Sequence, residues 1–366
     1  MTNLELSPLV SDSLAPPLFG LDQRQREERL YDVLRDLTEY HLRASSDYER
    51  IVEAMFPNWR DDQTIAGLPW LPVGLFKQRI LQSVPNSEIF KRITSSGTTG
   101  QMPSQVVIDR TTAKRQTKAL TSIMTSLLGQ GRRPMLVIDS ESILNDRTGR
   151  TARAAGVVGL MTLGRNHTFA LDENMRPLAE RIRHFATEHA GKPLLIFGFT
   201  FMVWKFLVQE LADQKIDLSG ATLVHSGGWK QMEAEKVDND TFKQMLRQRF
   251  GIKQVINFYG MAEQVGSVYI EGDDGLLHPS AFADVIVRDP STWKEVPVGQ
   301  EGVIQVLSSV PTSYPGHSIL TEDVGVIESV DADSNSLGGK AFRVVGRLPK
   351  SELRGCSDTF AAGRHA

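Results

Sequence analysis

The sequence predicts an α/β protein with a mostly parallel, helix-covered sheet and a smaller β-rich unit towards its C-terminal end. Between residues 135 and 259, short apolar segments alternate with longer helical ones, which is the spacing of crossover units. Beyond residue 280 the segments become alternating or β-branched, with turn signals between them. We therefore expect an α/β domain with N-terminal helices over residues 1–280 and a β-rich unit over residues 281–366.

Two regions precede this alternation. Residues 21–56 are rich in charge, and their apolar residues recur at helical spacing, which predicts one or two helices. Residues 67–81 contain Pro69 and Pro72 between apolar residues, which predicts an irregular connection. The connection leads to a segment dense in glycine, serine and threonine.

Each later element is predicted from its local pattern. The expected strands of the α/β part are 105–109, 135–139, 193–197, 221–226 and 254–259. The expected helices are 111–128, 174–190, 201–214 and 231–250. The expected strands of the β-rich unit are 283–288, 302–308, 325–330 and 341–345.

The composition of the chain argues against a nucleic-acid-binding protein and against a membrane-spanning one. The 366 residues are 40% hydrophobic and 23% charged, which is enough for a large core. With 41 basic and 44 acidic residues spread along the chain, there is no basic stripe, so nucleic acid is not an expected partner. The first twenty residues carry no Lys or Arg, and no run approaches about 18 apolar residues, so we expect a cytoplasmic protein without a membrane span.

One segment has the composition of an anion-binding loop. It places four hydroxyl residues and two glycines in six positions, namely Ser95, Ser96, Gly97, Thr98, Thr99 and Gly100. Glycine lets the backbone approach an oxyanion, and hydroxyl and amide groups donate hydrogen bonds to phosphate oxygens. It lacks the glycine spacing and the Gly-Lys pair of a Walker loop. A solvent-exposed turn without a ligand would have a similar composition, so the choice between a turn and a phosphate-binding loop depends on other motifs.

A second segment, Asn257-Phe258-Tyr259-Gly260-Met261-Ala262-Glu263, follows a predicted parallel strand. In open α/β sheets, ligands gather beyond the carboxyl ends of the strands. A tyrosine ring and a glutamate able to hold a metal at that edge are suitable nucleotide contacts.

Five motifs occur in a fixed order along the chain: SSGTTGQMPSQ, HSGGWK, FYGMAEQVG, LTEDVG and VGRLPKSELRGCS. Their order resembles the superfamily of acyl- and aryl-CoA synthetases, adenylation domains and firefly luciferase. Within it, the chain is most similar to the LuxE-type acyl-protein synthetases, which activate fatty acids for bioluminescence reductase complexes. The resemblance runs from about residue 70 to 359, and PVGLFK at 72–77 and FGFTFMVW at 197–204 also look typical of the family.

The resemblance implies an ATP site. Its hydroxyl residues Ser95, Ser96, Thr98 and Thr99 would hold the phosphates. The adenine pocket would be formed by Ser226, Gly227 and Gly228, with Tyr259 stacking on the base beside Gly260.

The same resemblance implies a metal and a ribose contact. Glu263 would hold the Mg²⁺ that neutralises phosphate charge. Asp323 in LTEDVG resembles the acid that binds the ribose hydroxyls, and Arg347 in VGR resembles the arginine that joins it.

Two features depart from the superfamily pattern. Ser104 follows Pro103 where a lysine is usual, which removes one cation facing the phosphates. We also expect the mobile C-terminal domain with its late lysine to be missing, which is a feature of LuxE-type proteins. We name Lys230, directly after SGGW, as a candidate replacement cation, although a surface lysine has the same signature. His225, which precedes that motif, is a candidate catalytic residue or a structural one.

The only cysteine, Cys356, excludes an intramolecular disulfide and a multi-cysteine zinc site. It lies within Arg354-Gly355-Cys356-Ser357, and a nearby arginine favours the nucleophilic thiolate. A buried, inert cysteine is the alternative. LuxE-type proteins carry their acyl group on a cysteine in a similar context, which implies that ATP and a carboxylic acid give acyl-AMP, and that the acyl group then passes to Cys356 as a thioester.

Two rival functions remain open at this point. One is a ligase that passes the acyl group directly to coenzyme A or to an acyl carrier protein, independently of Cys356. The other is a non-catalytic nucleotide-binding subunit that scaffolds an acyl reductase complex, suggested by the two missing lysines. Either a homo-oligomer or a hetero-oligomer is compatible with the sequence.

Overall fold

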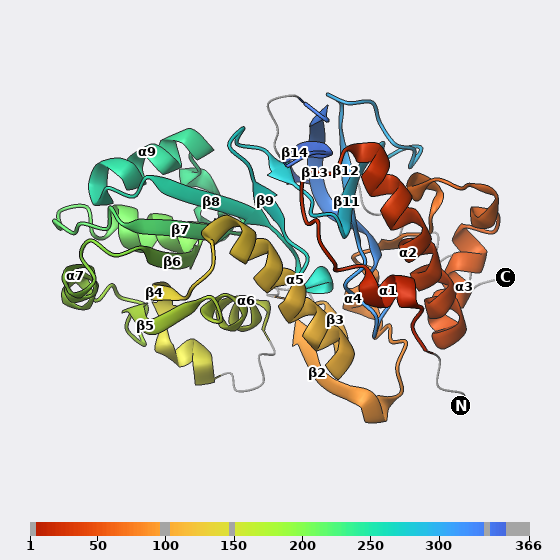
Figure 1. Ribbon diagram of the computed structural model, residues 1–366, viewed down its shortest axis with the longest axis horizontal. Helices are drawn as coiled ribbons and strands as arrows, with labels where there is room; N and C mark the ends of the chain where they lie inside the picture. Colours follow the sequence, from red (N-terminus) through yellow and green to blue (C-terminus); the bar gives the residue numbers. More distant parts are fainter. Residues whose placement is uncertain (1–4, 96–102, 146–150, 333–336, 349–366) are drawn as a thin grey trace.

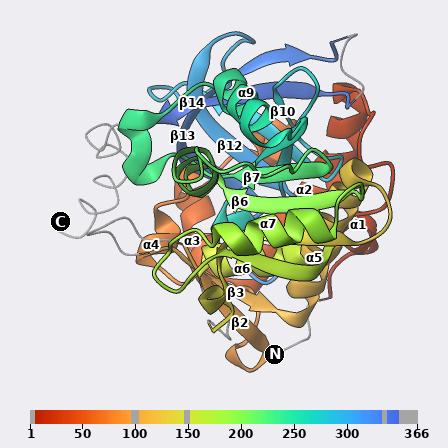
Figure 2. The same cartoon turned by 90° about the vertical axis from the view of Figure 1, so that its left-hand side faces the viewer.

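The computed structural model describes residues 5–95, 103–145, 151–332 and 337–348 (Figure 1). Its centre is a 12-stranded mixed sheet in the order β11-β12-β13-β14-β10-β9-β8-β7-β6-β4-β5, with β1 added beside β13. A separate two-stranded ribbon is formed by β2 and β3. Figures 1 and 2 place this ribbon at one end of the molecule and β14 at the other.

The parallel half of the sheet holds the strands that the sequence predicts most directly. They are β4 (Arg133–Ser140), β5 (Gly164–Leu171), β6 (Leu194–Phe199), β7 (Ala221–Ser226) and β8 (Gln254–Tyr259). Successive side chains of a strand point to opposite faces, and in β4 Met135 and Val137 join one core while Leu136 and Ile138 join another. A sheet covered on both faces requires the apolar runs that the sequence shows.

Helices cover both faces of this half. One core contains residues of α5 (Arg110–Leu128) and α6 (Ala152–Met161). The other contains residues of α7 (Ala179–Glu188), α8 (Thr200–Met202), the π-helix η5 (Val203–Gln209) and α9 (Asn239–Phe250). Within the described ranges, no helix combines the length and apolar character needed to cross a membrane.

The C-terminal part is rich in antiparallel strands. They are β9 (Tyr269–Glu271), β10 (Leu277–His278), β11 (Ala283–Arg288), β12 (Glu301–Ser308), β13 (Ser318–Val330) and β14 (Lys340–Arg347). The α/β class is confirmed, and the sheet is mixed because these strands continue it. Since β10 pairs with both β9 and β14, strands on the two sides of residue 280 share one sheet, and a domain boundary at that residue stays a prediction.

The N-terminal region packs against the C-terminal strands (Figure 1). Its elements are α1 (Pro8–Asp12), α2 (Gln23–Ala44), α3 (Ser46–Met55), β1 (Leu71–Pro72), α4 (Leu75–Gln78), β2 (Ile89–Thr94) and β3 (Gln105–Asp109). In α2 the buried Arg26 donates hydrogen bonds to the carbonyls of Pro279 and Ser280. The side chain of Arg115 in α5 donates to Ser13 Oγ at 2.9 Å and to the Ser309 carbonyl at 2.7 Å. Buried guanidinium groups therefore join segments that are distant in sequence.

Several element boundaries differ from the sequence prediction. The helix expected over 231–250 is broken, because Asp238 caps a new helix by accepting from Thr241 N, and a separate 3₁₀ segment, η6 (Lys230–Glu235), precedes it. The helix expected over 201–214 is the α8–η5 pair and ends at Gln209. The irregular connection over 67–81 contains β1 and α4, and the strand expected over 325–330 starts earlier, at Ser318.

Candidate functional site

Three of the predicted site residues meet at one carboxylate. Asp323 lies on β13, opposite Arg347 of β14 in the antiparallel register. The Tyr259 hydroxyl, at the end of β8, donates to Asp323 Oδ2 at 2.7 Å, and Arg347 Nε donates to Oδ1 at 3.0 Å. The Arg347 side chain is 71% exposed and that of Asp323 is 16% exposed, so this cluster opens to solvent on one side.

The electrostatics of this cluster fix its protonation. Burial raises the pKa of Tyr259 well above its ordinary value, and the adjacent Asp323 charge raises it further. The phenol therefore keeps its proton and acts as a hydrogen-bond donor. Each Asp323 oxygen retains a further lone pair for an incoming hydroxyl group. The arrangement orients a carboxylate towards a ligand that carries hydroxyls.

Glu263 is held rigidly in the short segment η7 (Ala262–Gln264). Its backbone carbonyl accepts a 2.7 Å hydrogen bond from Tyr314 Oη, and the next side chain, Gln264, donates to the carbonyls of Val306 and Gly316. Glu263 is only 4% exposed. The sequence therefore places a buried acid on a firmly anchored turn.

Burial raises the pKa of the Glu263 carboxyl above its ordinary value. The Ser104 hydroxyl and the charge of Lys77 oppose this rise, while the charge of Glu322 adds to it. Ser104 Oγ faces the carboxyl without meeting regular hydrogen-bond geometry to any described residue. A cation beside Glu263 would relieve the cost of keeping this carboxylate charged.

The base of the predicted phosphate loop lies beside this acid. Ser95 N donates to the Ser104 carbonyl at 3.0 Å, and Ser104 N donates to Ser95 Oγ at 2.9 Å. These bonds close the β2–β3 ribbon at the loop. Five predicted loop residues lie outside the described residues: Ser96, Gly97, Thr98, Thr99 and Gly100.

The residues expected around adenine lie on neighbouring strand ends. Ser226 ends β7 and is in register with Phe258, one residue before Tyr259. Gly227 has a positive φ of 85°, a conformation that favours glycine. A Cβ atom added to Gly228 would meet nothing within 4 Å, whereas one added to Gly260 would come within 3.3 Å of Val268 Cγ1. The backbone at Gly228 is thus open to a flat ligand.

His225 lies on β7, one residue before Ser226, and its side chain is part of a buried aromatic cluster. Its Nδ1 is 2.9 Å from Thr200 Oγ1, and its ring centroid is 4.7 Å from that of Phe242. Burial, aided by the charge of Lys243, lowers the pKa of His225 to about 3. The imidazole is therefore neutral at physiological pH. The side chain of Lys230 and all of Cys356 lie outside the described residues, so their roles stay predictions.

One ion pair at this site, between Lys77 and Glu322, was not expected from the sequence. Lys77 Nζ lies 2.8 and 3.1 Å from the two carboxylate oxygens of Glu322, the residue before Asp323. The pair forms because β1 lies parallel to the start of β13, with Leu71 opposite Ile319. The motif PVGLFK contained the signal, since Lys77 ends it, but nothing in the sequence shows that it reaches residue 322.

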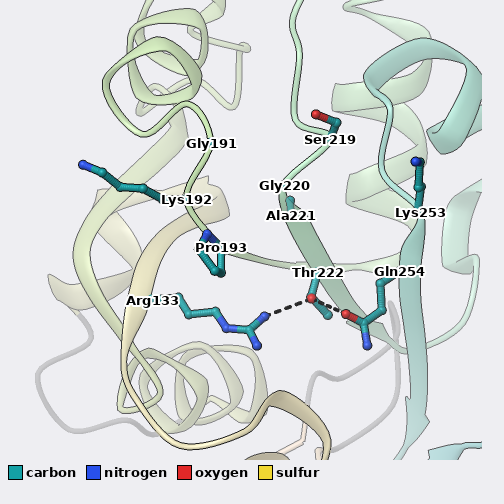
Figure 3. A pocket seen from close by; sticks show the side chains of 10 residues that line it. All are labelled: Arg133, Gly191, Lys192, Pro193, Ser219, Gly220, Ala221, Thr222, Lys253 and Gln254. Carbon is teal, nitrogen blue, oxygen red and sulfur yellow. Dashed lines mark hydrogen bonds between the residues drawn. The ribbon is translucent and has the colours of Figure 1, made fainter.

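A separate hollow of about 470 Å³ lies at the opposite end of the parallel strands (Figure 3). Its side chains include Arg133, Lys192 and Lys253, which reach it from three different segments. Figure 3 shows Arg133 donating to Thr222 Oγ1, which in turn donates to Gln254. The hollow is at the amino ends of β6 and β7, whereas the candidate site lies beyond the carboxyl ends.

Comparison with known proteins places the chain in a family. The model of the family "Acyl-protein synthetase, LuxE" matches residues 4–363. The chain belongs to this family.

Curated relatives of this LuxE-family protein are named as ligases. A long-chain-fatty-acid–luciferin-component ligase of Aliivibrio fischeri is 25% identical over 305 residues, covering 81% of this chain and 79% of the relative. The corresponding ligase of Vibrio harveyi is 22% identical over 346 residues, covering 92% and 87%. The LuxE-family chain is accordingly an enzyme, an acid ligase that uses ATP.

Solved structures support the fold. A 2-hydroxyisobutyryl-CoA ligase, determined with its acyl-AMP and CoA, aligns with a TM-score of 0.65 at 18% identity, covering 93% of this chain and 82% of that one. An amide bond synthetase, McbA from Marinactinospora thermotolerans, aligns with a TM-score of 0.50 at 18% identity, covering 72% and 50%. The LuxE-family chain therefore has the fold of adenylate-forming enzymes.

Proposed function

We propose that this enzyme activates a long-chain fatty acid as its acyl-adenylate and then carries the acyl group on Cys356 as a thioester. The observation that supports it best is the Tyr259–Asp323–Arg347 cluster, a carboxylate oriented for hydroxyl groups beyond the carboxyl end of β8. The names of the curated relatives support a fatty acid as the substrate class.

The proposed chemistry has two balanced steps. A carboxylate oxygen of the acid attacks the α-phosphorus of ATP, and the bond to the bridging oxygen breaks to release pyrophosphate. The Cys356 thiolate then attacks the acyl carbonyl, a C–S bond forms, and the C–O bond to AMP breaks. ATP is needed because a carboxylate is a poor electrophile.

The candidate residues take the following roles in this proposal. Asp323 accepts hydrogen bonds from the ribose hydroxyls, and Tyr259 and Arg347 hold its two oxygens in place. The open backbone at Gly228, with Ser226, Gly227 and Gly260 nearby, leaves room for adenine. The loop from Ser95 to Gly100 provides hydroxyl and amide donors for the phosphates.

Glu263 fits a magnesium ligand. Mg²⁺ is usually held by one or two carboxylates together with substrate phosphates, and it needs no cage of protein ligands. Among the described residues no group of three or more His, Cys, Asp or Glu forms such a cage, whereas Glu263 is buried, anchored and without a hydrogen-bonded cation. When bound, the ion would neutralise phosphate charge as pyrophosphate departs. Lys230 remains a candidate cation, and His225 a candidate catalytic residue.

The proposal is tested by isotope exchange between pyrophosphate and ATP across acids of graded chain length and aromaticity. Exchange that depends on a long-chain acid is expected, and no exchange with any acid would refute the proposed adenylation step. This assay addresses activation and the acid class together.

The thioester step needs its own test. With ATP, Mg²⁺ and labelled fatty acid, the wild-type protein should retain label that hydroxylamine removes, and Cys356→Ser should retain none. Persistent label in that variant would exclude Cys356 as the carrier. Full production of acyl-CoA or acyl carrier protein by Cys356→Ser would instead support the direct ligase. If the thioester forms, an acyl reductase subunit is the acceptor we propose first.

A further inference from the structure

The ion pair of Lys77 and Glu322 lies at the edge of the proposed phosphate site. Lys77 Nζ contacts both oxygens of Glu322, and the two side chains are 24% and 26% exposed. Partial exposure means that water reaches both groups, so the pair is neither deeply buried nor freely mobile. An ammonium group in this setting is able to exchange one anionic partner for another at small cost.

The packing around Lys77 connects its helix, α4, to the turn that carries Glu263. Its neighbour Phe76 is fully buried and packs edge-on against Tyr314, with ring centroids 6.2 Å apart. The hydroxyl of Tyr314 donates to the backbone carbonyl of Glu263. One buried aromatic contact therefore links the turn that carries the proposed magnesium ligand to the helix that carries Lys77.

Two further contacts place α4 beside β13 and beside β3. Val73 N donates to the Leu320 carbonyl at 2.8 Å, which fixes the start of α4 against β13. Helix α4 also contacts β3, the strand that begins directly after Ser104.

The carboxylates around the proposed phosphate site require a cation if a triphosphate is to bind beside them. Ser104 stands where related loops have a lysine, and Arg347 is already bonded to Asp323. The charges of Asp323 and Glu322 both act on the Arg347 guanidinium, so the two carboxylates lie near one another. A nucleotide whose ribose meets Asp323 would add the negative charge of its phosphates to this region, and the ammonium group of Lys77 would reduce the repulsion.

We propose that Lys77 binds the phosphates of ATP in this enzyme, and that Glu322 is its partner only while the nucleotide is absent. This inference rests on the proposed function, because it assumes that ATP binds at Asp323 and Glu263. It assigns to Lys77 the phosphate contact made by the loop lysine in related enzymes. Glu322 then holds the ammonium group near the site between turnovers.

The test is direct binding of ATP, AMP and adenosine, measured by calorimetry on the full-length protein. Lys77→Met should weaken ATP binding by about tenfold or more, weaken AMP less and leave adenosine unchanged, because a charge-assisted hydrogen bond to phosphate is lost. Lys77→Arg should retain part of the ATP affinity. Lys192→Met, in the hollow at the other end of the strands, is the matched control and should bind all three as the wild type does.

A second variant distinguishes two possible roles of Lys77, which are binding the phosphates and neutralising the charge of Glu322. If Lys77 acted only by neutralising Glu322, the double variant Lys77→Met with Glu322→Gln would recover wild-type ATP affinity. We expect it to remain weak, and we expect Glu322→Gln alone to bind ATP at least as tightly as the wild type. The double variant also removes the unpaired charge of Glu322, so it separates a loss of ATP binding from a folding defect caused by that charge.

Three results would overturn the inference. The first is that the double variant binds ATP as tightly as the wild type, and the second is that Lys77→Met weakens the binding of ATP, AMP and adenosine equally. The third is that Lys230→Met, and not Lys77→Met, loses affinity in proportion to the number of phosphates on the ligand. If the wild type binds ATP and catalyses exchange while Lys77→Met matches it, only the inference fails. If the wild type neither binds ATP nor catalyses exchange, the proposed function fails with it.

Discussion

Replacing Glu263 by Gln is expected to stabilise the nucleotide-free protein and to impair adenylation. Glu263 is 4% exposed and has no hydrogen-bonded cation among the described residues, so its charged form is disfavoured in the folded state. A carboxyl whose folded-state pKa is raised binds its proton more tightly when folded, and the corresponding stability is lost as the pH rises through that pKa. A neutral amide of the same size avoids this loss.

The change in Tm scales with the rise in the pKa. Each unit by which burial raises the pKa corresponds to about 1.4 kcal/mol of unfolding free energy lost at neutral pH. For 366 residues, at about 2.1 cal/mol/K each, 1 kcal/mol moves the Tm by roughly 1.3 °C. Glu263→Gln should therefore raise the Tm at pH 7, by roughly 1.8 °C for each unit by which burial raises the pKa, and the gain should disappear below about pH 4.5, where the wild-type acid is protonated in both states.

The assay is thermal unfolding from pH 4 to 8, with and without Mg²⁺ and ATP. Saturating ligand stabilises a protein by about 2.7 kcal/mol at 100 times its Kd, and Glu263→Gln should lose most of this ligand-induced gain. The matched control is Glu271→Gln, because Glu271 is also buried but is paired with Lys243 at 2.9 Å and accepts from Asn257 N. That variant should lower the Tm. If Glu263→Gln lowers the Tm as Glu271→Gln does, the Glu263 carboxylate is satisfied in the folded protein and our reading of its environment is refuted.

Three further substitutions test other parts of the structure. Tyr259→Phe removes the donor to Asp323 and should weaken ATP and adenosine equally, by about threefold to tenfold in Kd, and a loss confined to ATP would contradict a ribose role. Arg115→Met removes a buried guanidinium that donates to the Ser309 carbonyl and should lower the unfolding free energy by about 3 kcal/mol in urea titrations, whereas an unchanged midpoint would show that this bond is dispensable. Since the pKa of His225 is about 3, His225→Gln should leave the shape of the pH–rate profile between about pH 5 and 9 unchanged, and disappearance of a limb near neutral pH would refute this.

Several strands were predictable because their residues form short apolar or β-branched runs between helical segments. The runs over 105–109, 221–226 and 254–259 form strands with the predicted bounds, the first as β3 of the two-stranded ribbon and the others as β7 and β8 of the large sheet. The edge strand β5 was missed because exposed polar residues such as Arg165 interrupt its apolar pattern. The break before α9 was missed because Asp238 acts as a capping residue, a local signal that the helical periodicity on either side concealed.

Part of the geometry of the candidate site was predictable from the ordered motifs. Asp323 and Arg347 were expected to lie together, and the structure brings them together. The hydrogen bond from Tyr259 to Asp323 was not expected, because the resemblance gave Tyr259 only a stacking role, and the roles of all three residues stay predictions. Lys77 was not anticipated, because its position depends on pairing between β1 and β13, which no local pattern encodes. Long-range strand pairing is a tertiary property, and a two-residue strand carries almost no signal of its own.

The pairing of β1 with β13 has a practical consequence for work on this enzyme. A shortened chain that starts at the glycine-rich loop would keep every motif shared with the superfamily and would look complete by alignment. It would nonetheless lose Val73, which bonds Leu320, and Lys77, which neutralises Glu322, so that two acids would face the proposed nucleotide site without this cation. Weak ATP binding by such a fragment would reflect the loss of β1 and Lys77, and it would say little about the chemistry of the intact enzyme.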